Sequence, residues 1–198
     1  MAYISLVKNP EGAIPRLAFG YGRRRFGRDV EPVAAAAHHS GVLVAAGLME
    51  TAAERGWRKL DPHLAMLAVQ AVSGAIGCSW CIDFGYYESI QRGTDPAKVR
   101  DVPVWRTSDV YDDRERAVLE YAEAATETPT EVSEELMDRL HRHFTEAQIV
   151  ELAAWVALEN YRSRFNAGLG LRSQGFADEC RVPASIPDQQ EHVGPQGS

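Results

Sequence analysis

The sequence predicts a single, all-helical domain. Its 198 residues are enough for one substantial hydrophobic core and do not demand two. Apolar residues recur at the three- and four-residue spacing of helices through most of the chain. No segment combines period-two alternation with turn chemistry, as the strands of a sheet would. We therefore expect helices packed around one core and no sheet of consequence.

Residues 1–30 are expected to form a basic arm ahead of this domain. Six basic residues face only two acidic ones there: Lys8, Arg16, Arg23, Arg24, Arg25 and Arg28 against Glu11 and Asp29. Glycine and proline are frequent and periodicity is weak, so we expect at most one short helical turn between Arg16 and Arg25. The charge predicts that the arm docks on the acidic body of its own or a neighbouring subunit. A site for an anionic ligand is the alternative.

Start and stop signals divide the first half of the domain, residues 31–180, into helices. Residues 31–55 are helical in pattern, with a break or kink at Ser40-Gly41. Asp61-Pro62 begins the clearest helix, because an Asp N-cap followed by Pro is a favoured start, and Gly77 ends it. Its expected buried face runs through Leu64, Leu67, Ala68, Ala71, Val72, Ala75 and Ile76. A second helix is expected over 79–92, closed by Gly93, and Asp95-Pro96 opens a short third one.

The second half of the domain predicts three more helices. Residues 111–126 and 132–144 are amphipathic, and Pro129 separates them. Thr145-Glu-Ala-Gln148 is a capping box that leads into a helix apolar nearly all round, so we expect burial on several sides. Residues 181–198 contain no aromatic residue and several Pro and Gly, which predicts a flexible tail.

Composition excludes some functions. A net charge of -7 disfavours a broad nucleic-acid-binding surface. No run of about eighteen apolar residues occurs and the N-terminus lacks the features of a signal peptide, so a cytoplasmic protein without a membrane partner is expected. Three cysteines are too few for a disulfide framework.

The segment Cys78-Ser-Trp-Cys81 carries the most specific chemistry in the chain. It lies where one predicted helix stops and the next starts, and residues three apart share a helix face, so the sulfurs could form a reversible disulfide. A helix N-terminus also lowers a thiol pKa and favours the nucleophilic thiolate. Two alternatives stay open. One is a zinc site, which would need further ligands, and only Cys180 and sparse histidines are available for that. The other is a pair of buried cysteines without a chemical role.

Two segments carry a family resemblance: AVQAVSGAIGCSWCIDFGYYESIQRG and FTEAQIVELAAWVALENYRSRFNAGLGL. With the helices between them they resemble the alkyl hydroperoxidase D (AhpD)-like carboxymuconolactone decarboxylase family over residues 31–171. The resemblance implies an AhpD-like helical bundle that assembles as a dimer, trimer or hexamer. It also implies that the dithiol reduces a hydroperoxide or a disulfide, with a thiol protein as possible reductant. In the family pattern Cys81 attacks and Cys78 resolves, whereas helix-terminus logic alone favours Cys78.

The sequence also departs from the family pattern. The peroxidase members use a proton relay of one Glu and two His, and Met66, Trp80 and Gly85 occupy those positions here. None of them transfers a proton at neutral pH. Candidate substitutes are Asp83, Tyr86, Tyr87, Glu88, His39, His63 and His141.

Several of these candidates also have plainer readings. Asp83 could instead be a surface or capping carboxylate, and His39 and His63 ordinary surface or first-turn residues. Trp80 is expected to pack on the preceding helix, or alternatively to wall off the thiols. Arg164 and Asn166 are candidate pocket residues because they lie in the family-like stretch.

These observations predict a thiol oxidoreductase with peroxidase-like, peroxiredoxin-type antioxidant chemistry. A non-catalytic redox sensor or binding protein of the same fold is the alternative, and a lactone decarboxylase fits less well because that branch does not depend on the dithiol. No sequence feature argues for a metal, flavin, nicotinamide or haem cofactor.

Overall fold

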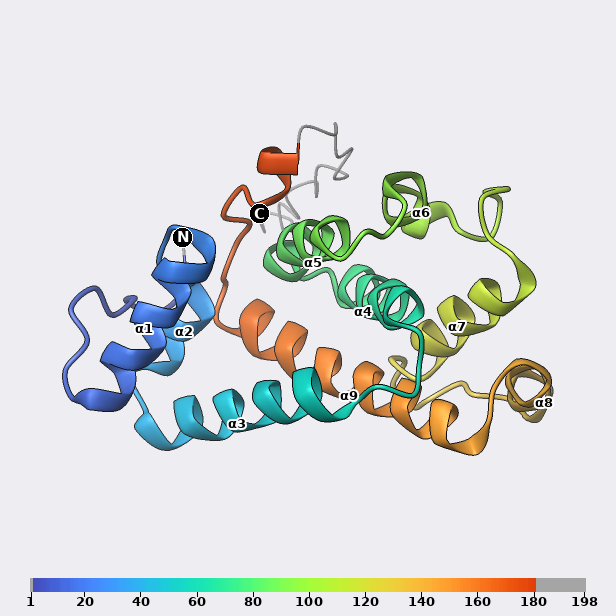
Figure 1. Ribbon diagram of the computed structural model, residues 1–198, viewed down its shortest axis with the longest axis horizontal. Coiled ribbons are helices and arrows are strands. Elements are labelled where there is room, and N and C mark those ends of the chain that lie inside the picture. The colour runs from blue at the N-terminus through green and yellow to red at the C-terminus, as the bar shows by residue number, and fades with distance from the viewer. Residues whose placement is uncertain (1, 181–198) are drawn as a thin grey trace, which may run out of the picture.

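The computed structural model describes residues 2–180, and every regular element among them is helical (Figure 1). In chain order these elements are α1 (Ala13–Phe26), α2 (Glu31–Ala36), α3 (Ser40–Gly56), α4 (Pro62–Ile76), α5 (Ser79–Gln91), α6 (Pro96–Asp101), the short 3-10 helix η1 (Val102–Val104), α7 (Asp113–Ala124), α8 (Glu134–His143), α9 (Glu146–Gly168) and η2 (Ala177–Cys180). The all-helical prediction is confirmed. The expected tail, 181–198, lies outside the described residues.

Helix α4 is the centre of the core. It packs against α9, α7 and α5, and all ten residues from Leu64 to Ser73 are buried (Figure 1). Burial on α4 therefore extends beyond the predicted face, although Ala75 of that face is exposed. Helix α9 is long and buries Leu152 and Trp155. Burial of α9 on several sides was expected, but α4 is the helix that the others surround.

Local capping sets most helix boundaries as expected. The Asp61 carboxylate accepts from the His63 backbone N–H at 3.0 Å, and Gly77 ends α4 with φ 76°. That left-handed φ suits glycine, which has no Cβ to clash. Helices α7 and α8 each begin two residues later than the periodicity predicts, because Asp112 and Ser133 act as their N-caps.

The basic arm is more ordered than its sequence predicts. Residues 13–26 form the full helix α1, with Arg23, Arg24 and Arg25 in its last turn, where cations complement the helix dipole. Arg25 binds Glu88 at 3.1 Å, and Phe26 packs edge-on against Phe84. The arm thus docks on the body of its own chain. Together α1, α2 and α3 form the blue part of the molecule beside the core (Figure 1).

Within residues 2–180, the helices are all too short or too polar to cross a lipid bilayer.

Candidate functional site

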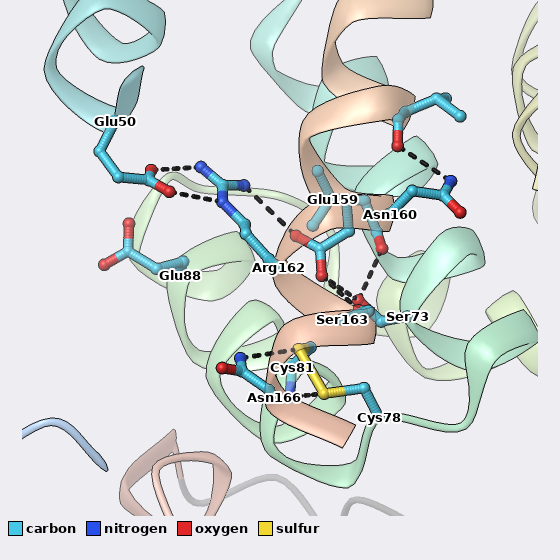
Figure 2. Close-up of polar contacts among 12 residues, drawn as sticks. Glu50, Ser73, Cys78, Cys81, Glu88, Glu159, Asn160, Arg162, Ser163 and Asn166 are labelled. Carbon is cyan, nitrogen blue, oxygen red and sulfur yellow. Dashed lines mark hydrogen bonds and ion pairs between the residues drawn. A yellow bond between two sulfur atoms is a disulfide. The ribbon is translucent and has the colours of Figure 1, made fainter. Parts of the chain in front are cut away.

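The two cysteines lie at the start of α5, where the sequence predicts them. Cys78 is the N-cap of α5 and Cys81 lies in its first turn, with 5.3 Å between their Cα atoms. The two sulfurs are joined in a disulfide (Figure 2). The Cys78 Sγ atom also accepts the Cys81 backbone N–H at 3.2 Å. An N–H group at a helix start therefore points at one sulfur and stabilises negative charge there.

A second donor reaches the other sulfur from α9. The side-chain amide of Asn166 donates to Cys81 Sγ at 3.3 Å, and Asn166 is itself buried (Figure 2). Each sulfur thus has one neutral N–H donor. Such donors favour the thiolate over the thiol without supplying a base.

The dithiol is closed off from solvent in an apolar cluster. Cys78 is 1% exposed and Cys81 5% exposed, and their cluster includes Val30, Trp80 and Phe176. The Trp80 ring stacks on Phe84 with 4.8 Å between ring centres, and Phe176 meets Phe84 edge-on at 5.2 Å. The aromatic partners of Trp80 are thus on its own helix and on the chain after α9.

Asp83 anchors the chain that follows α9. Its buried carboxylate accepts the backbone N–H groups of Gln174 (2.8 Å), Phe176 (3.1 Å) and Ala177 (2.7 Å). Asp83 is therefore buried, not at the surface, and it binds backbone N–H groups of a distant segment. Because three donors already occupy this carboxylate, it serves attachment rather than proton transfer to the sulfurs.

A buried carboxyl group, Glu159, lies on the same helix as Asn166. Glu159 accepts from the hydroxyls of Ser163 at 2.6 Å and Ser73 at 3.0 Å, and from Arg162 at 3.3 Å (Figure 2). Arg162 in turn binds Glu50. Burial raises the pKa of the Glu159 carboxyl. Its signal in the sequence is an acidic residue in the middle of a helix that is apolar nearly all round.

Comparison with known proteins shows to which family this chain is related. A profile of the carboxymuconolactone decarboxylase family matches residues 27–124. The uncharacterized protein YnjA of Escherichia coli is 35% identical over 130 residues, which cover 66% of this chain and 70% of YnjA. The chain belongs to the carboxymuconolactone decarboxylase family.

Solved structures share the fold of this family member. One is a peroxidase-related protein with an alkylhydroperoxidase AhpD core from Ralstonia eutropha, with a TM-score of 0.77 and 21% identity over 91% of this chain and 99% of that chain. Another is an alanine-for-cysteine variant of the debrominase Bmp8 in complex with 2,3,4-tribromopyrrole. It has a TM-score of 0.77 and 22% identity, over 90% of this chain and 97% of that chain.

The structure explains one departure of this family member from the peroxidase relay. A Cβ atom at Gly85 would lie 2.4 Å from the side-chain nitrogen of Gln70, so any larger residue there requires the buried Gln70 side chain to shift. Met66 is buried in the main core with Leu67 and Val69, away from the cluster that holds the cysteines. The relay positions are therefore filled by apolar packing and by a close helix contact.

The other candidates lie in other contacts. His39 is exposed and caps α3 by accepting the Val42 N–H at 3.3 Å, and His63 pairs with Glu115 at 2.6 Å. Tyr86 is buried in a separate small cluster with Val99. Arg164 is exposed and binds the Thr126 carbonyl at 3.1 Å. Of the residues offered as relay or pocket members, Asn166 contacts a sulfur and Trp80 shares the apolar cluster of the dithiol.

Proposed function

We propose that this protein is a thiol-disulfide oxidoreductase with peroxidase-type chemistry, acting through Cys78 and Cys81. The observation that carries the proposal is the bonded sulfur pair at the start of α5, with an N–H donor on each sulfur. Such an arrangement stabilises a thiolate and lets a second sulfur close the disulfide. Membership of a family that includes hydroperoxidase-like proteins adds support.

The reaction balances without a bound cofactor. A cysteine thiolate attacks the terminal oxygen of a hydroperoxide, the O–O bond breaks, and the alkoxide takes a proton to leave as an alcohol. The resulting sulfenic acid is attacked by the second thiolate, which forms the disulfide and releases water once a proton is supplied. A thiol reductant, such as a partner protein with its own dithiol, then returns two electrons and two protons to the disulfide.

Cys81 is the proposed attacking cysteine. The family resemblance assigns that role to the second cysteine, and Cys81 is the more exposed of the two. Cys78 then resolves the sulfenic acid from its position as N-cap. Among residues 2–180 the sequence positions of the relay hold no base, and the hydrogen bonds to the sulfurs come from neutral N–H groups, so we expect turnover slower by about 10² to 10⁴ than with an operating relay.

Reductive dehalogenation is a second candidate reaction for the same dithiol. The aromatic rings around the sulfurs favour a flat apolar substrate, and a solved relative in fold is a debrominase. In this reaction two thiols supply two electrons and two protons. The C–Br bond of an aryl bromide breaks and a C–H bond forms in its place. The products are the arene, bromide, one proton and the disulfide.

Intact-mass analysis with thiol alkylation tests the proposal. Reduced wild-type protein, Cys78→Ser and Cys81→Ser are each treated with one equivalent of hydroperoxide, all in a Cys180→Ser background so that the third cysteine does not contribute. A loss of two hydrogens confined to the protein with both cysteines, and a trapped sulfenic acid in Cys78→Ser, support the proposal. If no mass changes in any variant, the dithiol is inert to peroxide and the non-catalytic binding protein replaces this function.

A further inference from the structure

The chain after α9 forms a strap over the dithiol, defined here as residues 171–178. Figure 1 shows it leaving the end of α9 and running past α5. Leu171 and Phe176 of the strap are buried in the apolar cluster that contains both cysteines. Any reagent that reaches the sulfurs from this side must move the strap.

The hydrogen bonds that hold the strap come largely from side chains, and its last two residues, Ala177 and Asp178, begin η2. Asp83 alone receives three of its backbone N–H groups. The Gln174 side-chain oxygen accepts from Trp80 Nε1 at 2.8 Å and from the Glu31 backbone N–H at 3.0 Å. Arg28 donates to the Gln174 carbonyl at 2.7 Å. Because Asp83 and Gln174 take part in most of these hydrogen bonds, weakening either residue should raise the population in which the strap is open.

The ring of Phe176 occupies a site lined by aromatic rings and one guanidinium, which we call its seat. The ring is fully buried, and it meets Phe84, Tyr87 and Phe26 with ring centres 5.2, 5.7 and 6.1 Å apart. The Arg28 guanidinium lies 4.8 Å from its centre. Edge-to-face partners and a cation over the face are the contacts that aromatic rings prefer. Another ring of the same size would make the same contacts.

We propose that the strap opens, and that the substrate is an aryl-alkyl hydroperoxide whose ring takes the seat of Phe176. This inference rests on the proposed function and names its substrate class. In the closed state Phe176 and Trp80 exclude water and small oxidants from the sulfurs. In the open state a substrate ring held against Phe84 places its peroxide group beside the dithiol. Hydrogen peroxide has no ring and gains nothing from the seat.

Alkylation of the reduced protein tests strap opening without any oxidant. In a Cys78→Ser, Cys180→Ser background, Asp83→Asn removes the charge that binds three N–H groups. We expect iodoacetamide to modify Cys81 about tenfold faster, because the open population rises. Asp95→Asn is the matched control: Asp95 also accepts a backbone N–H, from Ala97 at 2.8 Å, but it caps α6 instead of holding the strap. An equal rate in Asp83→Asn and the control would overturn the proposal.

Single-turnover oxidation tests the substrate class. With both cysteines present, Phe176→Ala empties the seat, so the ratio of oxidation rates for cumene hydroperoxide over hydrogen peroxide should rise about tenfold. Phe176→Leu keeps the seat filled and should change the ratio little. An unchanged ratio of these two oxidation rates in a folded Phe176→Ala protein would contradict the proposed substrate class. Should Asp83→Asn fail to fold, Gln174→Ala loosens the strap through a different contact and carries the same expectation for alkylation.

The two proposals fail in different ways. If Asp83→Asn is alkylated faster but no hydroperoxide oxidises the protein, strap opening is supported and the peroxidase function is contradicted. If hydroperoxide oxidises the wild-type protein, but Asp83→Asn and Gln174→Ala leave the alkylation rate unchanged and Phe176→Ala leaves the ratio of oxidation rates unchanged, the peroxidase function is supported. Strap opening is then contradicted.

Discussion

The side-chain amide of Asn166 on α9 donates a hydrogen bond to the sulfur of Cys81 on α5, across 85 residues of sequence. This contact ties the longest helix to the dithiol. It is the one hydrogen bond that the described side chains of α9 make to a sulfur, and it lies in otherwise apolar surroundings. Its strength should therefore depend on the charge of that sulfur.

Replacing Asn166 by Ala should raise the pKa of the Cys81 thiol. The amide stabilises the thiolate, so its loss favours the thiol. Alkylation rates measured against pH in the reduced Cys78→Ser, Cys180→Ser background give this pKa. Asn160→Ala is the control, because Asn160 lies on the same helix but binds Thr126 at 2.9 Å. A shift shared by both variants would show that the contact with Cys81 is not the cause.

Glu159→Gln should change how stability depends on pH. Burial raises the pKa of Glu159 in the folded protein, so the folded state holds the proton more tightly than the unfolded chain. Wild-type protein therefore loses this stability as pH rises from the unfolded pKa, about 4.3, through the folded pKa. Glutamine has no proton to lose. The difference in melting temperature, variant minus wild type, should therefore increase as pH rises through this range. A pH-independent difference between the two proteins does not affect this test.

Glu135→Gln provides a control of opposite sign. Backbone and side-chain hydrogen bonds at the start of α8 lower the pKa of Glu135, so its stability is present above the unfolded pKa and is lost as pH falls. The difference for this variant should fall as pH rises. Parallel curves for the two variants would contradict the assignment of a raised pKa to Glu159.

Gly85→Ala should be destabilising relative to Gly74→Ala, by about 1 kcal/mol, because a Cβ at residue 85 forces the buried Gln70 side chain to shift. Chemical denaturation measures the change. A second substitution, Gln70→Ala, removes the colliding group and should recover part of the loss. Gly74→Ala in α4 is the control, since a Cβ there meets nothing within 4 Å and alanine favours the helix. Equal losses at both glycines would argue against the collision.

The homo-oligomer that the family resemblance implies stays a proposal, and the exposed apolar face of α3 is the place to test it. Ala45, Leu48, Met49 and Ala52 share this face by helical spacing, and all four are exposed, Leu48 to 66%. Leu48→Glu with Met49→Glu should therefore lower the mass measured by light scattering. Val104→Glu, at an exposed apolar residue on η1, should leave it unchanged. A monomeric wild-type protein would end this proposal.

The sequence by itself determined most helix boundaries and the position of the dithiol. Asp61, Gly77 and the Cys78 N-cap act on backbone groups within a few residues, so local chemistry is enough to predict them. The family resemblance likewise depends on contiguous segments. Helix α1 was underestimated because it buries only Phe19 and Gly22, which leaves almost no apolar periodicity to read.

Only the tertiary structure decided what surrounds the sulfurs. The donors to Asp83 lie 91 to 94 residues away in sequence. Asn166 and Glu159 owe their environments to the packing of α9 against α5 and α4. No local pattern distinguishes Phe176 from any other aromatic residue in a loop. Burial and long-range hydrogen bonds arise when distant segments exclude water together, and a linear pattern does not contain that information.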